Sequence, residues 1–184
     1  MKRWLAALAA ATALGMTAWV APAAAADRAY CGIGWGSLPK EAAWAGSAHL
    51  TGVRAGRHAC FDRLVLDLDG RQSGYSVRYV TQIKRDGSGF VVPVRGGAKL
   101  EIVSRADEDL SHGSMPVPTY RAANRAELVD VAGWRTFRQV AHAGTFEGHT
   151  TIGLGVRARL PYRVFTVNGP GAGSRLVIDV AHRW

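Results

Sequence analysis

The chain has 184 residues and a formal net charge of +9, and 48% of its residues are hydrophobic. This length favours a single domain that is large enough to bury a real core. No run of Lys and Arg is longer than two residues, so the charge predicts no nucleic-acid-binding arm. A basic domain suits anionic envelope polymers or phospholipid surfaces instead, although the abundant Arg of a GC-rich genome would give the same charge.

Residues 1–26 have the pattern of a cleavable signal peptide. Lys2 and Arg3 supply a positive start, residues 4–20 carry no charge, and a run of small residues ends at Ala26. Cleavage after Ala26 would export the protein and leave 158 residues with a net charge of +7 and no transmembrane segment. The alternative is a retained anchor, but about 17 uncharged residues lie near the lower limit for crossing a bilayer.

Cys31 and Cys60 are the two cysteines of the sequence. An even number of cysteines outside the cytoplasm predicts a disulfide, which would tie a lead-in segment over residues 27–46 to the first strong strand. Closing a loop of this size stabilises a fold by about 3–4 kcal/mol. The alternative, a metal site that includes His58 and Cys60, has no identifiable further ligands, so neither metal nor cofactor is predicted.

Alternating apolar and polar side chains predict a strand-rich domain over residues 47–184. Leu64, Leu66 and Leu68 would share one face of their strand. The remaining strands are expected at residues 74–85, 90–94, 99–105, 134–143, 150–158, 162–168 and 175–181. Eight or nine short strands without a convincing helix predict an all-β fold, either a two-sheet β-sandwich or a flattened barrel. Residues 107–130 are expected to form a long loop, because they are polar and contain two prolines.

Several stretches taken together identify a family. These are Trp35-Gly36-Ser37, Cys60–Gly70 (CFDRLVLDLDG), Gly144–Gly148 (GTFEG), Thr151–Gly155 (TIGLG), Pro161–Phe165 (PYRVF) and Arg175–Val180 (RLVIDV). Over about residues 30–181 the chain resembles the AMIN-like domain of secreted actinobacterial proteins. That family is similar to the AMIN domain, which targets cell-wall amidases to the envelope. The resemblance implies a β-sandwich that associates with the envelope or peptidoglycan and has no catalysis of its own.

The densest basic cluster of the sequence contains Arg157, Arg159 and Arg163. Arginine binds carboxylates with paired donors, and the peptide stems of peptidoglycan carry carboxylates. Tyr162 could stack on a sugar beside them. Arg157 and Arg159 would point to the same side if their strand continued to Leu160. The four residues are therefore predicted as a ligand-binding patch, with ordinary solvated arginines as the alternative.

Two tryptophans and two charged pairs have structural and functional interpretations. Trp35 and Trp44 could stack on sugars, although packing over the sheet near the disulfide is favoured. Two pairs are expected to support the fold across the sheet: Asp62 with Arg63, and Arg175 with Asp179.

An enzyme is not expected. Asp67 and Asp69 are two residues apart and could serve acid–base chemistry or a calcium ion, but Asp-Gly after a strand is foremost a turn signal. The six histidines have no zinc-binding spacing, and there is no GxSxG motif. The prediction is a monomeric, secreted module whose partner is a cell-wall polymer or an envelope protein. The alternatives are an envelope hydrolase and an inhibitor domain that binds through residues 107–130.

Overall fold

The structure is a computed structural model that describes residues 30–43, 48–71, 74–112, 115–169 and 171–184. The expected signal peptide and Trp44 lie outside these residues. Over the described ranges the chain is all-β apart from a single 3-10 turn, η1 (Tyr30–Gly32). No helix within them has the length and apolar character needed to cross a bilayer.

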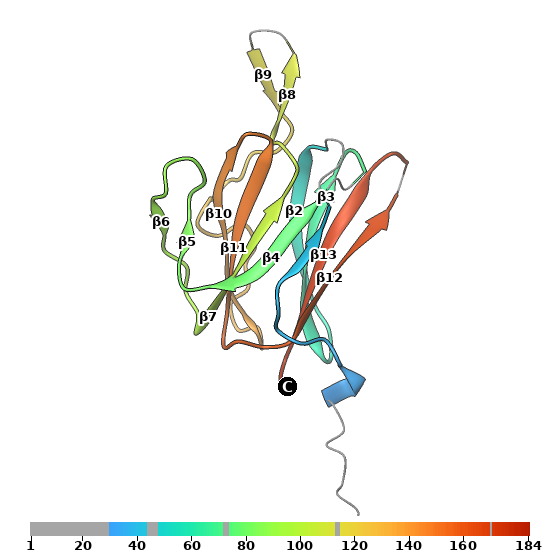
Figure 1. Ribbon diagram of the computed structural model, residues 1–184, viewed down its shortest axis with the longest axis vertical. Helices are drawn as coiled ribbons and strands as arrows, with labels where there is room; N and C mark the ends of the chain where they lie inside the picture. Colours follow the sequence, from blue (N-terminus) through green and yellow to red (C-terminus); the bar gives the residue numbers. More distant parts are fainter. Residues whose placement is uncertain (1–29, 44–47, 72–73, 113–114, 170) are drawn as a thin grey trace, which may run out of the picture.

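Two antiparallel sheets face each other and form a sandwich (Figure 1), which confirms the predicted fold class. The larger sheet has the strand order β1 (Lys40–Ala42), β4 (Tyr75–Val80), β7 (Ala98–Ser104), β11 (His149–Val156) and β10 (Phe137–Phe146). The smaller sheet has the order β12 (Tyr162–Asn168), β13 (Ser174–Ala181), β3 (Phe61–Leu68) and β2 (Leu50–Arg57).

Two small hairpins extend from the sandwich. β5 (Ile83–Lys84) pairs with β6 (Val91–Val92), and β8 (Asp109–His112) pairs with β9 (Met115–Pro118). The second hairpin projects from one end of the molecule (Figure 1) and corrects the prediction of an unbroken loop over residues 107–130. Its prolines do not prevent pairing, because a strand of a two-stranded sheet needs donors on one side alone.

Three strand predictions differ from the structure. β2 was missed, because Gly52 and Gly56 interrupt its apolar pattern. The lead-in segment contributes the short edge strand β1, although no strand was expected there. The strand expected over residues 74–85 ends at Val80, and the chain then leaves the sheet to enter β5.

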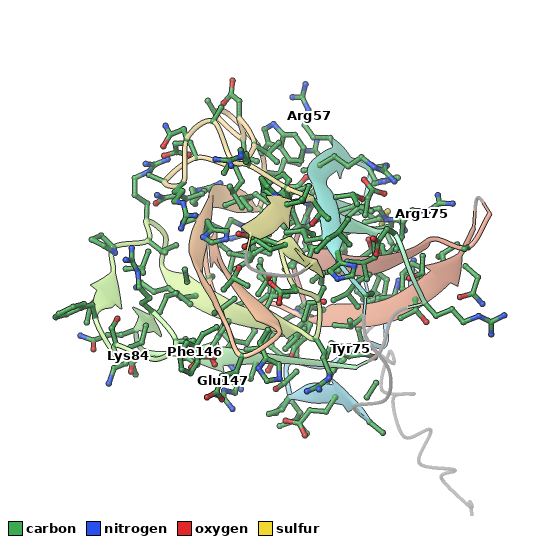
Figure 2. All side chains as sticks on the ribbon, turned by 90° about the horizontal axis from the view of Figure 1, so that it is seen from above. Arg57, Tyr75, Lys84, Phe146, Glu147 and Arg175 are labelled. Carbon is green, nitrogen blue, oxygen red and sulfur yellow. A yellow bond between two sulfur atoms is a disulfide. The ribbon has the colours of Figure 1, made fainter. Side chains whose placement is uncertain are left out.

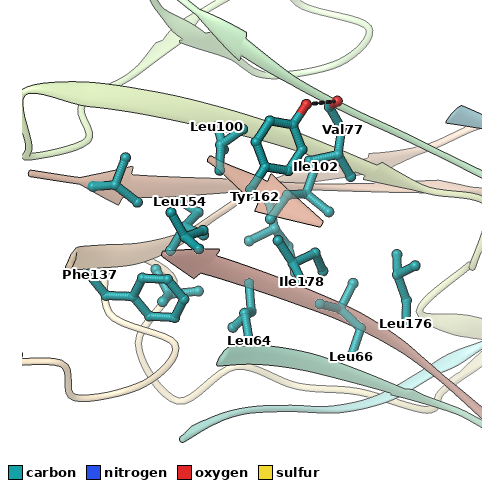
Figure 3. Close-up of a cluster of buried hydrophobic side chains, with 14 of the residues drawn as sticks. Leu64, Leu66, Val77, Leu100, Ile102, Phe137, Leu154, Tyr162, Leu176 and Ile178 are labelled. Atoms are coloured by element: carbon teal, nitrogen blue, oxygen red, sulfur yellow. Dashed lines mark hydrogen bonds between the residues drawn. The ribbon is translucent and has the colours of Figure 1, made fainter. Parts of the chain in front are cut away.

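Apolar side chains from the two facing sheets form the core (Figure 3). Leu64 and Leu66 of β3 and Ile178 of β13 are fully buried, as the period-2 pattern predicts. The opposite sheet supplies Leu100, Ile102 and Leu154, among others. Because the large apolar side chains of these strands recur at every second residue, the alternation in the sequence indicates which side faces the core.

Tyr162 is the largest fully buried side chain and joins the two sheets. It belongs to β12, yet its hydroxyl lies 2.7 Å from the carbonyl oxygen of Val77 in β4, as Figure 3 shows. The hydroxyl also lies 2.8 Å from the carbonyl oxygen of Leu38 in the lead-in segment. Burial raises the pKa of Tyr162, so its hydroxyl stays protonated and can donate.

Replacing Tyr162 by Phe should lower the free energy of unfolding by about 1–3 kcal/mol, because the buried carbonyl of Val77 and the part-buried carbonyl of Leu38 would lose the one O–H donor that they share. Urea denaturation measures the change. Tyr75→Phe is the matched control, since the hydroxyl of half-buried Tyr75 makes no hydrogen bond to the described residues. Equal losses in the two variants would contradict the proposed role of the Tyr162 hydroxyl.

Candidate functional site

The structure removes Tyr162 from the predicted ligand-binding patch. Tyr162 is 0% exposed, so its ring cannot stack on a sugar, and that part of the prediction is wrong. Strand β11 ends at Val156, so Arg157 and Arg159 lie in the turn after it and do not share a strand face.

The three arginines of the predicted patch all make contacts within the protein. Arg157 donates to the carbonyl oxygen of His182, and the Arg159 Nε lies 3.1 Å from the Ser37 hydroxyl. Arg163 forms an ion pair with Asp179 at 2.9 Å on the outer face of the smaller sheet. Ligand binding by these arginines stays a prediction, and Arg159 and Arg163 both contact the lead-in segment, at Ser37 and Trp35 respectively.

The expected charged pairs are also rearranged. Asp179 is 0% exposed and binds both Arg63 and Arg163, since Arg63 is its register partner on β3 and Arg163 its partner on β12. Asp62 instead accepts hydrogen bonds from the backbone N–H groups of Thr136 and Phe137. Arg175 donates to the carbonyl oxygen of Gly169. The predictions of Asp62 with Arg63 and of Arg175 with Asp179 were therefore wrong, because the register sets the partners.

Trp35 packs at the disulfide end of the smaller sheet. Its ring makes an edge contact with Phe61 at 5.6 Å, and the guanidinium of Arg163 lies 4.5 Å from its centre. Cys31 and Cys60 form the predicted disulfide, which holds this segment beside the start of β3. Packing of Trp35 near the disulfide is thus confirmed.

The carboxylates considered for catalysis have basic partners. Asp67 forms an ion pair with Arg54 at 2.7 Å, and Asp69 lies 3.0 Å from the Nδ1 of His49. Within the described ranges, no group of three or more His, Cys, Asp or Glu side chains could hold a metal ion. These residues therefore fit surface ion pairs at the strand end.

A groove of about 770 Å³ lies between the β5–β6 hairpin and edge strand β10. Its floor is apolar: Ile83 and Val94 are buried there against Ala141 and Ala143 of β10. The far wall is the segment around Arg125 and Ala126, two further lining residues. We call this feature the basic groove.

Four cationic side chains line the basic groove: Arg85, Arg95, Lys99 and Arg125. Arg95 forms an ion pair with Glu127 at 2.5 Å, and this hydrogen bond raises the pKa of its guanidinium. The other three form no ion pair with any described residue. A net positive charge over an apolar floor fits a ligand that carries carboxylates or phosphates beside apolar groups.

Hydrogen bonds fix the walls of the basic groove. The backbone N–H of Arg95 donates to the Gln139 side-chain oxygen at 2.7 Å, and the Gln139 amide donates to the carbonyl of Ala126 at 2.8 Å. The backbone N–H of His142 donates to the carbonyl of Arg125 at 2.7 Å. The two walls are thus tied to β10, so the groove is preformed.

A buried pair lies at the base of the groove. The Nε2 of His142 and the side chain of Glu108 share a short hydrogen bond, and both residues are buried. The Nη1 of Arg125 lies 3.5 Å from the His142 Nδ1. This pattern fits a ring that carries its proton on Nε2 and offers a lone pair to Arg125. The pair therefore orients Arg125 from below.

Two glycines of the TIGLG stretch allow the groove to form. A side chain at Gly155 would place its Cβ 1.8 Å from the carbonyl oxygen of Arg95. At Gly153 the Cβ would lie 2.9 Å from Ile83 and 3.0 Å from Val94. The outer face of β11 must lack side chains there, because the β5–β6 hairpin and the chain after it cross the sheet at contact distance.

Sequence reasoning missed the basic groove. Its four cations are spread over 41 positions, from residue 85 to residue 125, and none belongs to a dense cluster. The glycine alternation of residues 151–155 was the available signal, because paired glycines on one face of a strand indicate a close crossing.

A comparison with family models identifies the family to which the chain belongs. A model of the AMIN-like domain matches residues 48–182. The chain belongs to the AMIN-like domain family. No curated protein and no solved structure matches it. An AMIN-like domain suggests an envelope-targeting module, and the matched range of this one contains all the residues that line the basic groove.

Replacing Gly155 by Ala should lower the free energy of unfolding by about 1–3 kcal/mol, because the added methyl group would overlap the Arg95 carbonyl. The midpoint of urea denaturation measures this. Gly34→Ala is the control, since no atom lies within 4 Å of its added Cβ. An unchanged midpoint for Gly155→Ala would show that the close crossing is not constrained.

Proposed function

We propose that this AMIN-like protein is a secreted, non-catalytic module that binds an anionic polymer of the cell envelope, peptidoglycan, in the basic groove. The signal-peptide pattern of residues 1–26 supports export. Family membership supports association with the envelope. The observation that carries the proposal is the set of four cations around a preformed apolar floor.

The groove chemistry fits the peptide stems of peptidoglycan. Arg85 and Arg125 face the hollow without an ion-pair partner among the described residues, so each can receive a carboxylate with paired donors. The methyl groups of Val92 and Val94 can contact the small apolar side chains between the carboxylates. Arg95 and its partner Glu127 form the rim and supply both a donor and an acceptor.

Co-sedimentation of the chain from Asp27 onward with purified cell-wall sacculi tests this proposal. The protein should pellet at low salt, and Arg85→Gln combined with Arg125→Gln should weaken the apparent affinity by at least about tenfold, because two charge-assisted contacts are lost. Arg71→Gln combined with Arg175→Gln is the matched control for charge. The control lies far from the groove, because Arg175 and Lys84, the neighbour of groove residue Arg85, lie on opposite sides of the molecule (Figure 2).

Two outcomes would contradict the proposal. The first is wild-type protein that stays in the supernatant at low salt. The second is an equal loss of binding in the groove variant and in the control, which would mean that net charge alone drives association. A circular dichroism spectrum and a urea midpoint for each variant verify that its fold is intact.

A second measurement separates binding from hydrolysis. Sacculi incubated with the protein should release no soluble muropeptides beyond the buffer blank, because the proposal assigns the His142–Glu108 pair to orienting Arg125 and not to acid–base chemistry. Release that depends on protein concentration would contradict the non-catalytic assignment and favour an envelope hydrolase. Heat-inactivated protein is the control.

A further inference from the structure

Five exposed arginines gather at the end of the sandwich where β2 and β13 finish and β3 begins. We call this surface the arginine end, and it comprises Arg57, Arg135, Arg157, Arg159 and Arg183. The C terminus and η1 lie at this same end (Figure 1). The basic groove is a separate surface, since none of these five arginines lines it.

Contacts through the loop after β2 bring three of these arginines together. Arg135 Nη1 and the Tyr30 hydroxyl both donate to the carbonyl oxygen of Ala59, each at 3.4 Å. The guanidinium of Arg183 lies 4.7 Å from the centre of the Tyr30 ring. Arg57 lies two residues before Ala59 and points away from the ribbon (Figure 2).

The other two arginines join the cluster through the C-terminal segment. Arg157 donates to the carbonyl oxygen of His182, one residue before Arg183. The Trp184 indole N–H donates to the carbonyl oxygen of Arg159 at 3.1 Å. The turn after β11 and the chain after β13 therefore form one continuous surface.

The positive charge of the arginine end is not neutralised by the protein. None of its five arginines forms a salt bridge with a described residue; their partners are carbonyls, a hydroxyl and aromatic rings. Asp62, an acidic residue at this end, is 1% exposed and accepts two backbone N–H groups. Carbonyls and rings orient a guanidinium without cancelling its charge, so the surface stays strongly positive.

Two apolar side chains project from the same surface. Leu38 is 71% exposed and Trp184 is 65% exposed. Leu38 is adjacent to Ser37, whose hydroxyl and carbonyl oxygens both accept hydrogen bonds from Arg159. An exposed tryptophan with its N–H satisfied, set among arginines, has the amphipathic character that suits the water–lipid boundary.

We propose that the arginine end docks on the anionic surface of a phospholipid bilayer. Each arginine near such a surface adds electrostatic attraction to lipid phosphates, and Trp184 and Leu38 would enter the headgroup layer. The domain would thus present its basic groove laterally, away from the membrane.

Vesicle co-sedimentation with the chain from Asp27 onward tests the proposal; this chain contains every strand of the described residues, since the first of them begins at Lys40. The protein should bind vesicles of phosphatidylcholine mixed with phosphatidylglycerol and not vesicles of phosphatidylcholine alone. Arg57→Gln combined with Arg183→Gln should weaken partitioning by at least about tenfold. These two arginines stack on rings and donate no hydrogen bond to the backbone of the described residues, so their loss should leave the fold intact.

Arg71→Gln combined with Arg175→Gln removes the same charge at the opposite end and should leave vesicle binding within about twofold of wild type. Trp184→Ala tests the apolar contribution and should weaken partitioning several-fold at unchanged charge. Failure to bind the anionic vesicles would overturn the proposal. So would equal losses in the arginine-end variant and the Arg71/Arg175 control.

The groove variant separates this proposal from the proposed function. Arg85→Gln combined with Arg125→Gln should keep vesicle binding while it loses sacculus binding, and the arginine-end variant should show the reverse. If the arginine-end variant lost sacculus binding and kept vesicle binding, this surface would instead bind the cell-wall polymer and the membrane proposal would be wrong.

Discussion

The packing of two antiparallel sheets against each other is the interaction on which the other features depend, and Tyr162 lies at its centre. Its ring fills the space between the sheets, and its hydroxyl joins β12 to β4 and to the lead-in segment. A hydroxyl at this depth stabilises the fold only because two carbonyls face it, since an unpaired polar group would oppose folding. The same bonds align the lead-in segment, which continues into β1 and completes the larger sheet.

The close crossing over β11 turns this sandwich into a binding scaffold. With glycines at 153 and 155, the chain from β5 to β7 can lie directly on the outer face of the sheet, and its lateral separation from β10 leaves the basic groove. Gln139 and the His142–Glu108 pair then fix the walls from below. The groove is therefore part of the rigid body of the domain, which lowers the entropic cost of ordering a ligand site.

Positive charge is divided between two surfaces that differ in shape. The basic groove is concave with an apolar floor, whereas the arginine end projects exposed Leu38 and Trp184. A concave site can surround a defined chemical group, and projecting side chains can contact an extended surface. An envelope-targeting module that binds both a polymer and a membrane would hold the two at a set distance.

The period-2 alternation in the sequence determined the fold class, most strands and the core-facing side of each, because burial of one face is a local property of the pattern. The cysteine count determined the disulfide, and the combined motifs determined the family. The partners of Asp62, Asp179 and Arg175 were decided by the tertiary structure, since they depend on strand register. It also moved Tyr162 from a predicted ligand contact to the core. The basic groove and the arginine end exist only in the folded protein, because their cations come from segments that are distant in the chain and meet through sheet packing.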